Sequence, residues 1–568
     1  SVPEWVADKE CPFTGSAPGY TVECYRFNVP LNWTENREAQ CNRTTPVYIQ
    51  RIYHQGLDPS KARGHLVMGN PGGPGGAVFG FQMKQTWLGF HNLTNNKYVY
   101  YVQQVRGVEG NGSVTCAGKT PYVSGLRKVD AKSEKCLSDI LDNFGRDLRF
   151  YGYGQLTYDL RYTLSVIRNL RKRQSAKITV YGLSGGTKMM QNYWAMFPKR
   201  RDQFDQHILD GVVTPGPSPL FRTYNEATEH TINQIFTTCL FREECWEHFR
   251  GLTYHKRLRN GTFSEHPSPV ISVAGLYHHM IDVLLYDHAG SAPSKCMTKL
   301  EALAKKSGSN ILASSFVDII TLTMSTWSND VSKRPLYPVL VRMLRDCEFE
   351  NSDDAEKLFY LYTQMTITVD GLSMLTPTQL GSNALLSASQ MLNEYMLARN
   401  VQHDVRDISI EDLDSVYYDT SFIWGLIRLA KRLLKYRYTF DVELARTGRT
   451  RTPLMVIEGD YDPRTPSYAN NDYFGKTWIG NTKSQYSYKL PFGRHALIFS
   501  SPTTYDKNVE CGMQLIAAFV KRNGKLRRRD TLCVFRPVFP DFGLVDNSTL
   551  EMAALTFNSS YSWPPVST

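Results

Sequence analysis

Two kinds of hydrophobic pattern alternate along the first 215 residues of the chain. Short runs rich in apolar residues predict buried strands at 65–69, 98–102, 178–181 and 207–213. Apolar residues at helical spacing over 155–172 predict an amphipathic helix ahead of the third strand. Strands that alternate with helices indicate a parallel sheet covered on both faces. In such sheets, functional sites form beyond the carboxyl ends of the strands.

The pattern changes after residue 214. Strand patterns return only at 453–459 and 486–490, and the chain between is dominated by longer helical patterns, at 232–250, 295–306, 354–366, 383–399 and 421–436. A helical insertion between two sheet strands is typical of a lid over a catalytic face. We therefore expect an N-terminal half of the core at 1–214, a helical cap at 215–450, and a C-terminal half of the core with a tail at 451–568.

The strand at 178–181 leads directly into a Gly-x-Ser-x-Gly pattern over 182–186, and a helical pattern follows at once. This is the strand–turn–helix setting of a nucleophile elbow. Small residues on both sides let the turn be sharp enough to expose the hydroxyl of Ser184 beside the N-terminus of a helix. The five-residue pattern alone also fits an ordinary glycine-rich turn, so the chain must supply an acid, a histidine and an oxyanion loop as well.

Three other segments follow predicted strands and can supply these parts. The strand at 65–69 precedes Asn-Pro-Gly-Gly-Pro-Gly-Gly over 70–76, where backbone amides can approach a ligand without intervening side chains. A flexible linker is the alternative, but linkers seldom follow a buried strand with fixed prolines. Asp460 and Asp462 follow the strand at 453–459, and His495 follows the last strand. The order Ser, Asp, His along the chain is that of one type of catalytic triad.

Together, these motifs resemble the α/β-hydrolase fold, and within it the family of tripeptidyl and prolyl aminopeptidases. The Gly-Gly-Pro-Gly loop, the serine elbow and an Asp-Pro-x-Thr-Pro segment at 462–466 match that family, and the similarity spans roughly 20–215 and 450–535. The last match favours Asp462 over Asp460. The chain departs from the family at Gly185, where tyrosine is frequent, at 104–107, where Asp-Gln-Arg-Gly is usual, and at Arg494, where glycine is common.

The resemblance implies an α/β-hydrolase with a mostly parallel central sheet and a large helical cap between sheet strands. Ser184 would be the nucleophile, His495 the base and Asp462 its orienting acid. The N–H groups of Gly185 and Gly73 would hold the oxyanion, and no metal or organic cofactor is needed. The implied activity is release of short N-terminal units from peptides. An acid of the cap would then bind the substrate's ammonium group, with four candidates by location: Glu226, Glu229, Glu243 and Glu244.

Two other functions remain open. The same triad could hydrolyse a carboxylic ester or a lactone, because it acts equally on an oxygen leaving group. The chain could also be a non-catalytic binding protein on a hydrolase fold, although the presence of all three triad residue types argues against it.

Composition excludes several classes of protein. The 568 residues are 42% hydrophobic and 12% aromatic, which is enough for a large core and rules out a mainly disordered chain. No window offers about 18 uninterrupted apolar residues, so we expect no membrane span. The net charge of +11 is spread along the chain, with small clusters at 171–173 and 525–529. No nucleic-acid-binding motif accompanies it, and we interpret it as a basic solvated surface.

Cysteines and glycosylation signals point to the secretory route. There are 11 cysteines with no Cys-x-x-Cys pair, and Asn-x-Ser/Thr sequons occur at Asn32, Asn42, Asn92, Asn111, Asn260, Asn547 and Asn558. Cys239 and Cys245 are close enough to staple one turn, and the family resemblance implies a disulfide between Cys511 and Cys533. The chain begins at Ser1 without methionine, which fits a removed signal peptide. We expect a glycoprotein with disulfides that is secreted or resides in an endomembrane or lysosomal-type compartment.

Overall fold

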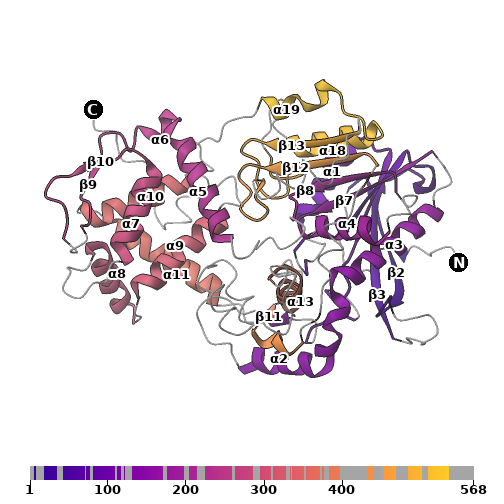
Figure 1. Ribbon diagram of the computed structural model, residues 1–568, viewed down its shortest axis with the longest axis horizontal. Helices are drawn as coiled ribbons and strands as arrows, with labels where there is room; N and C mark the ends of the chain where they lie inside the picture. The colour runs from indigo at the N-terminus through magenta and orange to yellow at the C-terminus, as the bar shows by residue number, and fades with distance from the viewer. Residues whose placement is uncertain are drawn as a thin grey trace. The chain divides into compact units, whose positions relative to one another are not determined.

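The computed structural model divides the chain into two compact units, Ser1–Tyr224 with Leu372–Val538 and Asn225–Gly371 with Phe539–Thr568 (Figure 1). Not every residue is described. The described residues are 6–7, 18–34, 43–70, 72–73, 75–76, 81–108, 112–116, 120–121, 131–170, 175–197, 204–213, 224–258, 262–285, 294–308, 311–327, 333, 335–350, 353–370, 374–375, 383–396, 431–436, 438, 450, 452–467, 484–501 and 509–536.

A nine-stranded sheet forms the centre of the first unit, in the order β1-β2-β3-β5-β4-β7-β8-β12-β13. The strands are β1 (Val6–Ala7), β2 (Tyr20–Pro30), β3 (Thr44–His54), β4 (Gly64–Asn70), β5 (Tyr98–Gln103), β7 (Lys177–Leu183), β8 (Gln206–Asp210), β12 (Leu454–Gly459) and β13 (Gln485–Leu490). Pairing is parallel from β5 to β13, while β1, β2 and β3 pair antiparallel at one side. The mostly parallel sheet expected from the alternating pattern is therefore confirmed.

Side chains of the parallel strands alternate between two apolar layers. On β4, Val67 belongs to one buried cluster, with residues of α3 (Tyr153–Leu170) and α4 (Gly185–Met196). Its neighbours Leu66 and Met68 belong to another, with residues of α1 (Phe81–Leu93) and α18 (Cys511–Lys521). Helices thus cover both faces, which explains why β4 is buried along its whole length.

The register of the sheet brings the carboxyl ends of its parallel strands to one edge. Asn70 of β4 pairs with Gly182 of β7, and Leu183 of β7 pairs with Asp210 of β8. Gly459 of β12 pairs with Leu490 of β13 in the same direction. The loops after β4, β7, β12 and β13 therefore leave the sheet at the same edge.

The second unit is helical. Its helices are α5 (Tyr224–Leu240), α6 (Glu243–Trp246), α7 (Val273–Leu285), α8 (Lys295–Lys306), α9 (Ala313–Trp327), α10 (Leu336–Phe349) and α11 (Asp354–Asp370), beside a short hairpin of β9 (Thr253–Tyr254) and β10 (Ser268–Pro269). The predicted helix at 232–250 is wrong in its extent, because the chain turns between Leu240 and Glu243. The expected disulfide Cys239–Cys245 closes that turn, and Cys296–Cys347 joins α8 to α10.

The remaining elements belong to the first unit. They are α2 (Ala131–Phe144), η3 (Gly145–Tyr151), α13 (Ala384–Gln390), the π-helical turn η6 (Met391–Met396), α19 (Leu532–Phe535), the 3₁₀ turns η2 (Pro59–Lys61), η10 (Leu434–Tyr436) and η12 (Arg528–Thr531), and the strand pair β6 (Thr120–Pro121) with β11 (Met374–Leu375). The expected disulfide Cys511–Cys533 is confirmed, and Cys116–Cys136 is a further one. The predicted cap at 215–450 thus spans both units, since α13 and η6 belong to the unit that holds the sheet. Its limits and its role as a lid stay predictions.

Among the described residues, no helix combines the length and apolar character that crossing a membrane requires. Of the seven sequons, Asn32 is half-buried and Asn92 is exposed. The other five, Asn42, Asn111, Asn260, Asn547 and Asn558, lie outside the described residues.

Arg106 and Asp159 form a fully buried ion pair beside the sheet. The guanidinium donates through Nε to Asp159 Oδ2 at 2.6 Å and through Nη1 to the carbonyls of Leu31 and Phe150, at 2.7 and 3.1 Å. Trp33 Nε1 also donates to Asp159 Oδ1, at 2.7 Å. Burial raises the pKa of Asp159 against the opposing charge of Arg106. Within the segment at 104–107 the chain therefore departs from the family pattern at Gln104 and Val105, while Arg106, which the pattern retains, ties loops to the core.

Replacing Arg106 by methionine should lower the free energy of unfolding by roughly 3–5 kcal/mol, because the Asp159 carboxylate is left buried without its partner. Thermal unfolding of purified protein measures this. The double variant Arg106→Met/Asp159→Leu should recover part of the loss. An equal loss in the single and the double variant would show that lost packing, and not the unpaired charge, is the cause.

His207 of β8 is a buried neutral histidine. Its Nδ1 accepts a hydrogen bond from Trp194 Nε1 at 3.0 Å, and its Nε2 lies 2.9 Å from Thr450 Oγ1. Burial lowers its pKa to about 3. As the pH falls, His207 is protonated near pH 6.5 in the unfolded chain, but only at much lower pH in the folded chain. The stability that neutral His207 contributes is therefore complete above pH 6.5 and is lost as the pH falls below it.

We expect acidification from pH 7.5 to pH 5 to cost about 2 kcal/mol of stability through His207. The variant His207→Gln keeps an acceptor for Trp194 but cannot take up the proton. Its thermal midpoint should therefore fall less than that of the unaltered protein over this pH range. Parallel curves for the two proteins would contradict the assignment.

Candidate active site

Ser184 occupies a sharp turn between β7 and α4. Its backbone has φ 52° and ψ −123°, a conformation that few residues other than glycine adopt. A Cβ at Gly182 would lie 2.9 Å from the carbonyl oxygen of Gly186, and one at Gly186 would lie 2.4 Å from that of Asn70. Glycine is therefore required at both positions, and the pattern over 182–186 has the geometry of a nucleophile elbow.

Neighbouring elements hold this strained turn in place. The N–H of Ser184 donates to the carbonyl of Asp210 at 2.9 Å. The carbonyl of Ser184 accepts from the N–H and the hydroxyl of Thr187, at 2.8 and 2.6 Å. The turn is thus fixed to the end of β8 on one side and to the first turn of α4 on the other, and Ser184 remains half-buried.

His495 and Asp462 are hydrogen-bonded to each other. His495 Nδ1 lies 2.8 Å from Asp462 Oδ2, and the Asp462 side chain is completely buried. Asp462 Oδ1 accepts the N–H groups of Arg464 and Thr465 at 2.8 and 2.9 Å, and the Thr465 hydroxyl donates to Oδ2 at 2.6 Å. Burial alone would raise the pKa of Asp462, but His495 and these hydrogen bonds outweigh it and lower the pKa. The carboxylate is therefore kept ionised.

The end of β8 brings the histidine to the same place as the serine. A Cβ at Gly211 would lie 3.1 Å from Cε1 of His495, so the imidazole packs directly on the residue that follows Asp210. The Asp210 side chain accepts the N–H groups of Leu497 and Ile498, at 2.8 and 3.1 Å, and the Tyr181 hydroxyl, at 2.7 Å. Burial raises the pKa of Asp210 to about 6, against these hydrogen bonds. Asp210 thus fixes both the Ser184 turn and the segment after His495.

The glycine loop after β4 passes over Ser184. A Cβ at Gly72 would lie 2.9 Å from Cβ of Ser184 and 3.5 Å from its Oγ. Gly72, Gly73 and Gly75 have φ values of 110°, 98° and 63°, which only glycine adopts without strain. The loop can therefore approach the serine hydroxyl through its backbone.

Most N–H groups of this loop are already used. The N–H of Gly72 donates to Asn70 Oδ1 at 2.8 Å, and that of Gly75 donates to Gln390 Oε1 at 2.9 Å. Pro74 has no N–H. Among the described residues of the loop between 72 and 75, this leaves the N–H of Gly73 without such an acceptor. As the first residue of α4, Gly185 has no intrahelical acceptor for its own N–H either.

Four parts of the chain meet at one edge of a mostly parallel sheet: the serine elbow after β7, the glycine loop after β4, the acid after β12 and the histidine after β13. This arrangement decides the fold class. The chain has the α/β-hydrolase fold.

No protein-family model and no curated protein matches the chain. Solved structures of α/β-hydrolases resemble it at low similarity. The peroxisomal α/β-hydrolase Lpx1 from Saccharomyces cerevisiae shares 10% identity, with 95% of this chain and 96% of that chain covered and a TM-score of 0.33. Feruloyl esterase B from Aspergillus oryzae shares 10% identity, with 92% and 85% covered and a TM-score of 0.32. MGS-M2, an α/β-hydrolase from a Medee basin deep-sea metagenome library, shares 11%, with 85% and 96% covered and a TM-score of 0.29.

The α/β-hydrolase core also accounts for Gly185, where the aminopeptidase family often has tyrosine. A Cβ at this position would lie 2.3 Å from the hydroxyl of Tyr153 and 2.6 Å from the carbonyl oxygen of Gly73. The space for a side chain after the nucleophile is thus filled by a tyrosine of α3.

The four acids proposed from the sequence as ammonium ligands all lie in the second unit. Glu244 forms an ion pair with Arg242 at 2.6 Å, and Glu229 lies 3.6 Å from His278. Glu243 is exposed, and the side chain of Glu226 is outside the described residues. Two of the four carboxylates therefore already have local partners.

Sequence reasoning missed a segment that supports the site, α13 with η6. The N–H of Asn383, which caps α13, donates to the carbonyl of Gly75 at 2.9 Å, and Gln390 accepts from the N–H of the same glycine. Glu394 Oε1 accepts the N–H of Tyr153 and the hydroxyl of Tyr438, at 2.9 and 2.7 Å. The segment is thus hydrogen-bonded to the glycine loop and to the start of α3. Its helical pattern carried no signal for this role.

Gln390 also donates to the carbonyl of Tyr151 at 2.7 Å, so both ends of its amide are used. If the enzyme turns over an acyl substrate, Gln390→Leu should lower kcat by about ten- to a hundredfold, because Gly75 loses its acceptor and the loop shifts. Steady-state kinetics on the purified variant measures this, with a smaller effect expected on KM.

Asn393→Leu is the matched control, since Asn393 is a buried amide on η6 that bonds Ser389 and Tyr438 and not the glycine loop. It should lower stability without the fall in kcat. A similar kcat for both variants would mean that Gln390 does not position the loop.

Proposed function

We propose that the protein is a serine hydrolase in which Ser184 attacks an acyl carbon and forms an acyl-enzyme. His495 takes the serine proton and later delivers it to the leaving group, while Asp462 holds the imidazole in the required orientation. The observation that carries this proposal is the 2.8 Å hydrogen bond between His495 and a buried Asp462, at the sheet edge where Ser184 forms the elbow.

The N–H groups of Gly185 and Gly73 are our candidates for the oxyanion hole. Two observations support them: Gly185 begins α4, and the other N–H groups between residues 72 and 75 are committed or missing. Donors of this kind stabilise the charge that develops on the carbonyl oxygen, and each is worth roughly a hundred- to a thousandfold in rate.

For the substrate, we propose an aminopeptidase that releases short N-terminal units from peptides. The support is the similarity of the glycine loop and of the Asp-Pro-x-Thr-Pro segment at 462–466 to tripeptidyl and prolyl aminopeptidases. The disulfides between described cysteines agree with a secreted or lumenal location. Cleavage of a carboxylic ester or lactone by the same residues is the competing proposal.

A substrate panel separates these proposals. Tripeptidyl amides of a fluorescent amine are compared with their N-acetylated forms and with simple aryl esters, each with Ser184→Ala as the background. Cleavage of the free peptides and not of the acetylated ones supports the aminopeptidase. Turnover of esters alone overturns it in favour of an esterase, and no turnover of any substrate, together with no phosphonate labelling, overturns the serine hydrolase itself.

A further inference from the structure

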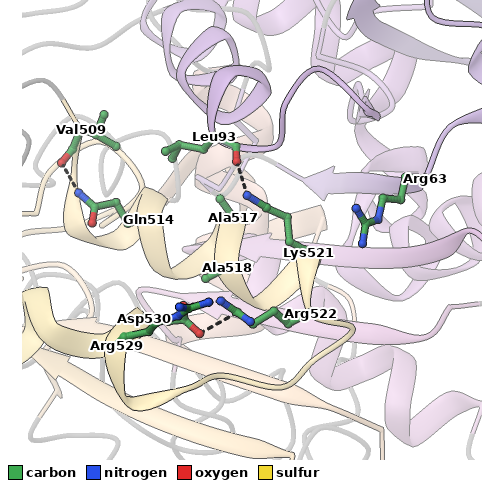
Figure 2. Close-up of a pocket in the computed structure, with 10 residues that line it drawn as sticks. All are labelled: Arg63, Leu93, Val509, Gln514, Ala517, Ala518, Lys521, Arg522, Arg529 and Asp530. Atoms are coloured by element: carbon green, nitrogen blue, oxygen red, sulfur yellow. Dashed lines mark hydrogen bonds and ion pairs between the residues drawn. The ribbon is translucent and has the colours of Figure 1, made fainter.

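A cavity of about 540 Å³ lies in the first unit, between the start of β4, the end of α1, helix α18 and the 3₁₀ turn η12 (Figure 2). Its floor includes the apolar side chains of Leu93, Ala517 and Ala518. Its volume falls in the range of sites for small organic ligands.

The charges that line this cavity are unbalanced. Four cations, Arg63, Lys521, Arg522 and Arg529, face a single acid, Asp530. Asp530 is already paired with Arg522, whose Nε lies 2.8 Å from Asp530 Oδ2; the dashed line in Figure 2 marks this pair. Lys521 donates to the carbonyl of Leu93 at 2.9 Å, which leaves its charge uncompensated.

The two remaining cations have no partner among the described residues. The guanidinium groups of Arg63 and Arg529 form no hydrogen bond or ion pair within the described part of the chain, and both residues are exposed. Arg529 belongs to the basic cluster at 525–529, which the catalytic proposal leaves unused. The cavity therefore joins this cluster to cations that come from distant parts of the sequence.

The cavity is remote from Ser184. Arg63 immediately precedes β4, whose first residue pairs with Lys177 at the start of β7, whereas Ser184 follows the last residue of β7. At about 3.3 Å per residue, the length of these strands separates the two by roughly 20 Å. A ligand in this cavity would not occupy the proposed catalytic centre.

We propose that this cavity binds a small organic polyanion that carries phosphate or sulfate ester groups. Guanidinium groups bind tetrahedral oxyanions through paired N–H donors, and an ammonium adds a further point charge. Cations from separate elements of the lining suit a ligand with at least two anionic groups, and the apolar lining residues suit its carbon skeleton. The proposal is independent of the proposed hydrolase activity.

Isothermal titration of the full chain with inositol hexakisphosphate and with sucrose octasulfate tests this and separates the phosphate from the sulfate ester. Neutral inositol and sucrose are the ligand controls. We expect binding of at least one polyanion, weakened about tenfold or more in Arg63→Gln/Arg529→Gln. Both arginines are exposed, so the variant should fold, and its thermal midpoint is checked first.

Lys305→Gln/Lys306→Gln removes the same charge from the exposed end of α8 and is the matched control. It should bind as the unaltered protein does, and so should Ser184→Ala. If both double variants bind the polyanion equally more weakly, the binding comes from general attraction by a chain of charge +11, and the proposed site is overturned. If neither inositol hexakisphosphate nor sucrose octasulfate binds, the proposed site is overturned as well.

Discussion

Replacing Ser184 by alanine is expected to abolish labelling by a fluorophosphonate probe and to lower kcat by about a thousandfold or more. The hydroxyl is the only group at the elbow that can form the acyl bond, and it stands at the carboxyl end of β7 below the glycine loop. Glycine occupies positions 182, 185 and 186, and the Thr187 hydroxyl is hydrogen-bonded to the Ser184 carbonyl, so these positions offer no replacement nucleophile.

The variant should fold normally, since the backbone bonds of Ser184 to Asp210 and Thr187 do not use its hydroxyl. Ser184→Gly offers an internal check. It also removes the nucleophile, but glycine accepts a φ of 52° without strain, so its thermal midpoint should exceed that of Ser184→Ala. Undiminished labelling of Ser184→Ala would show that the probe reacts elsewhere and would remove Ser184 from the mechanism.

The parts of the site that could be predicted from the sequence are those specified locally. A strand followed by a glycine-rich turn is visible within ten residues, as at 178–187, because the steric demand for glycine acts between near neighbours. Asp462 and His495 could be named as candidates because Asp462 follows a buried apolar strand, His495 follows the alternating strand β13, and the order of the strand ends is set by the fold.

The supporting contacts could not be predicted in the same way. Gln390 and Gly75 are 315 residues apart, and nothing in the helical pattern around Gln390 marks the amide as a partner for a loop. Asp210 falls within the predicted strand at 207–213, but its bonds to Leu497 and Ile498 depend on how β8 and the histidine segment pack. The turn between α5 and α6 was missed because Cys239, Cys245 and the apolar residues around them also fit one continuous helix.

Replacing Asp462 by asparagine is expected to lower kcat by about ten-thousandfold. Ser184 should stay in place and remain accessible to the phosphonate probe. In the native site the carboxylate accepts the Nδ1 proton of His495, which leaves Nε2 free to accept the serine proton. The N–H groups of Arg464 and Thr465 would hold the amide oxygen of an asparagine at the position of Oδ1. The amide NH₂ would then face Nδ1, favour the opposite tautomer and block the base.

Asp460→Asn is the matched control for this prediction. Both acids follow β12, but Asp460 forms its ion pair with Lys489, whereas the carboxylate that is hydrogen-bonded to His495 in the described part of the chain is that of Asp462. Its removal should change kcat by less than about threefold, since a partly exposed ion pair contributes little. Steady-state kinetics on both variants, with thermal midpoints measured beside them, decides between the two carboxylates. If Asp460→Asn loses activity and Asp462→Asn keeps it, the hydrogen bond between Asp462 and His495 is structural, and the orienting acid must be sought at position 460.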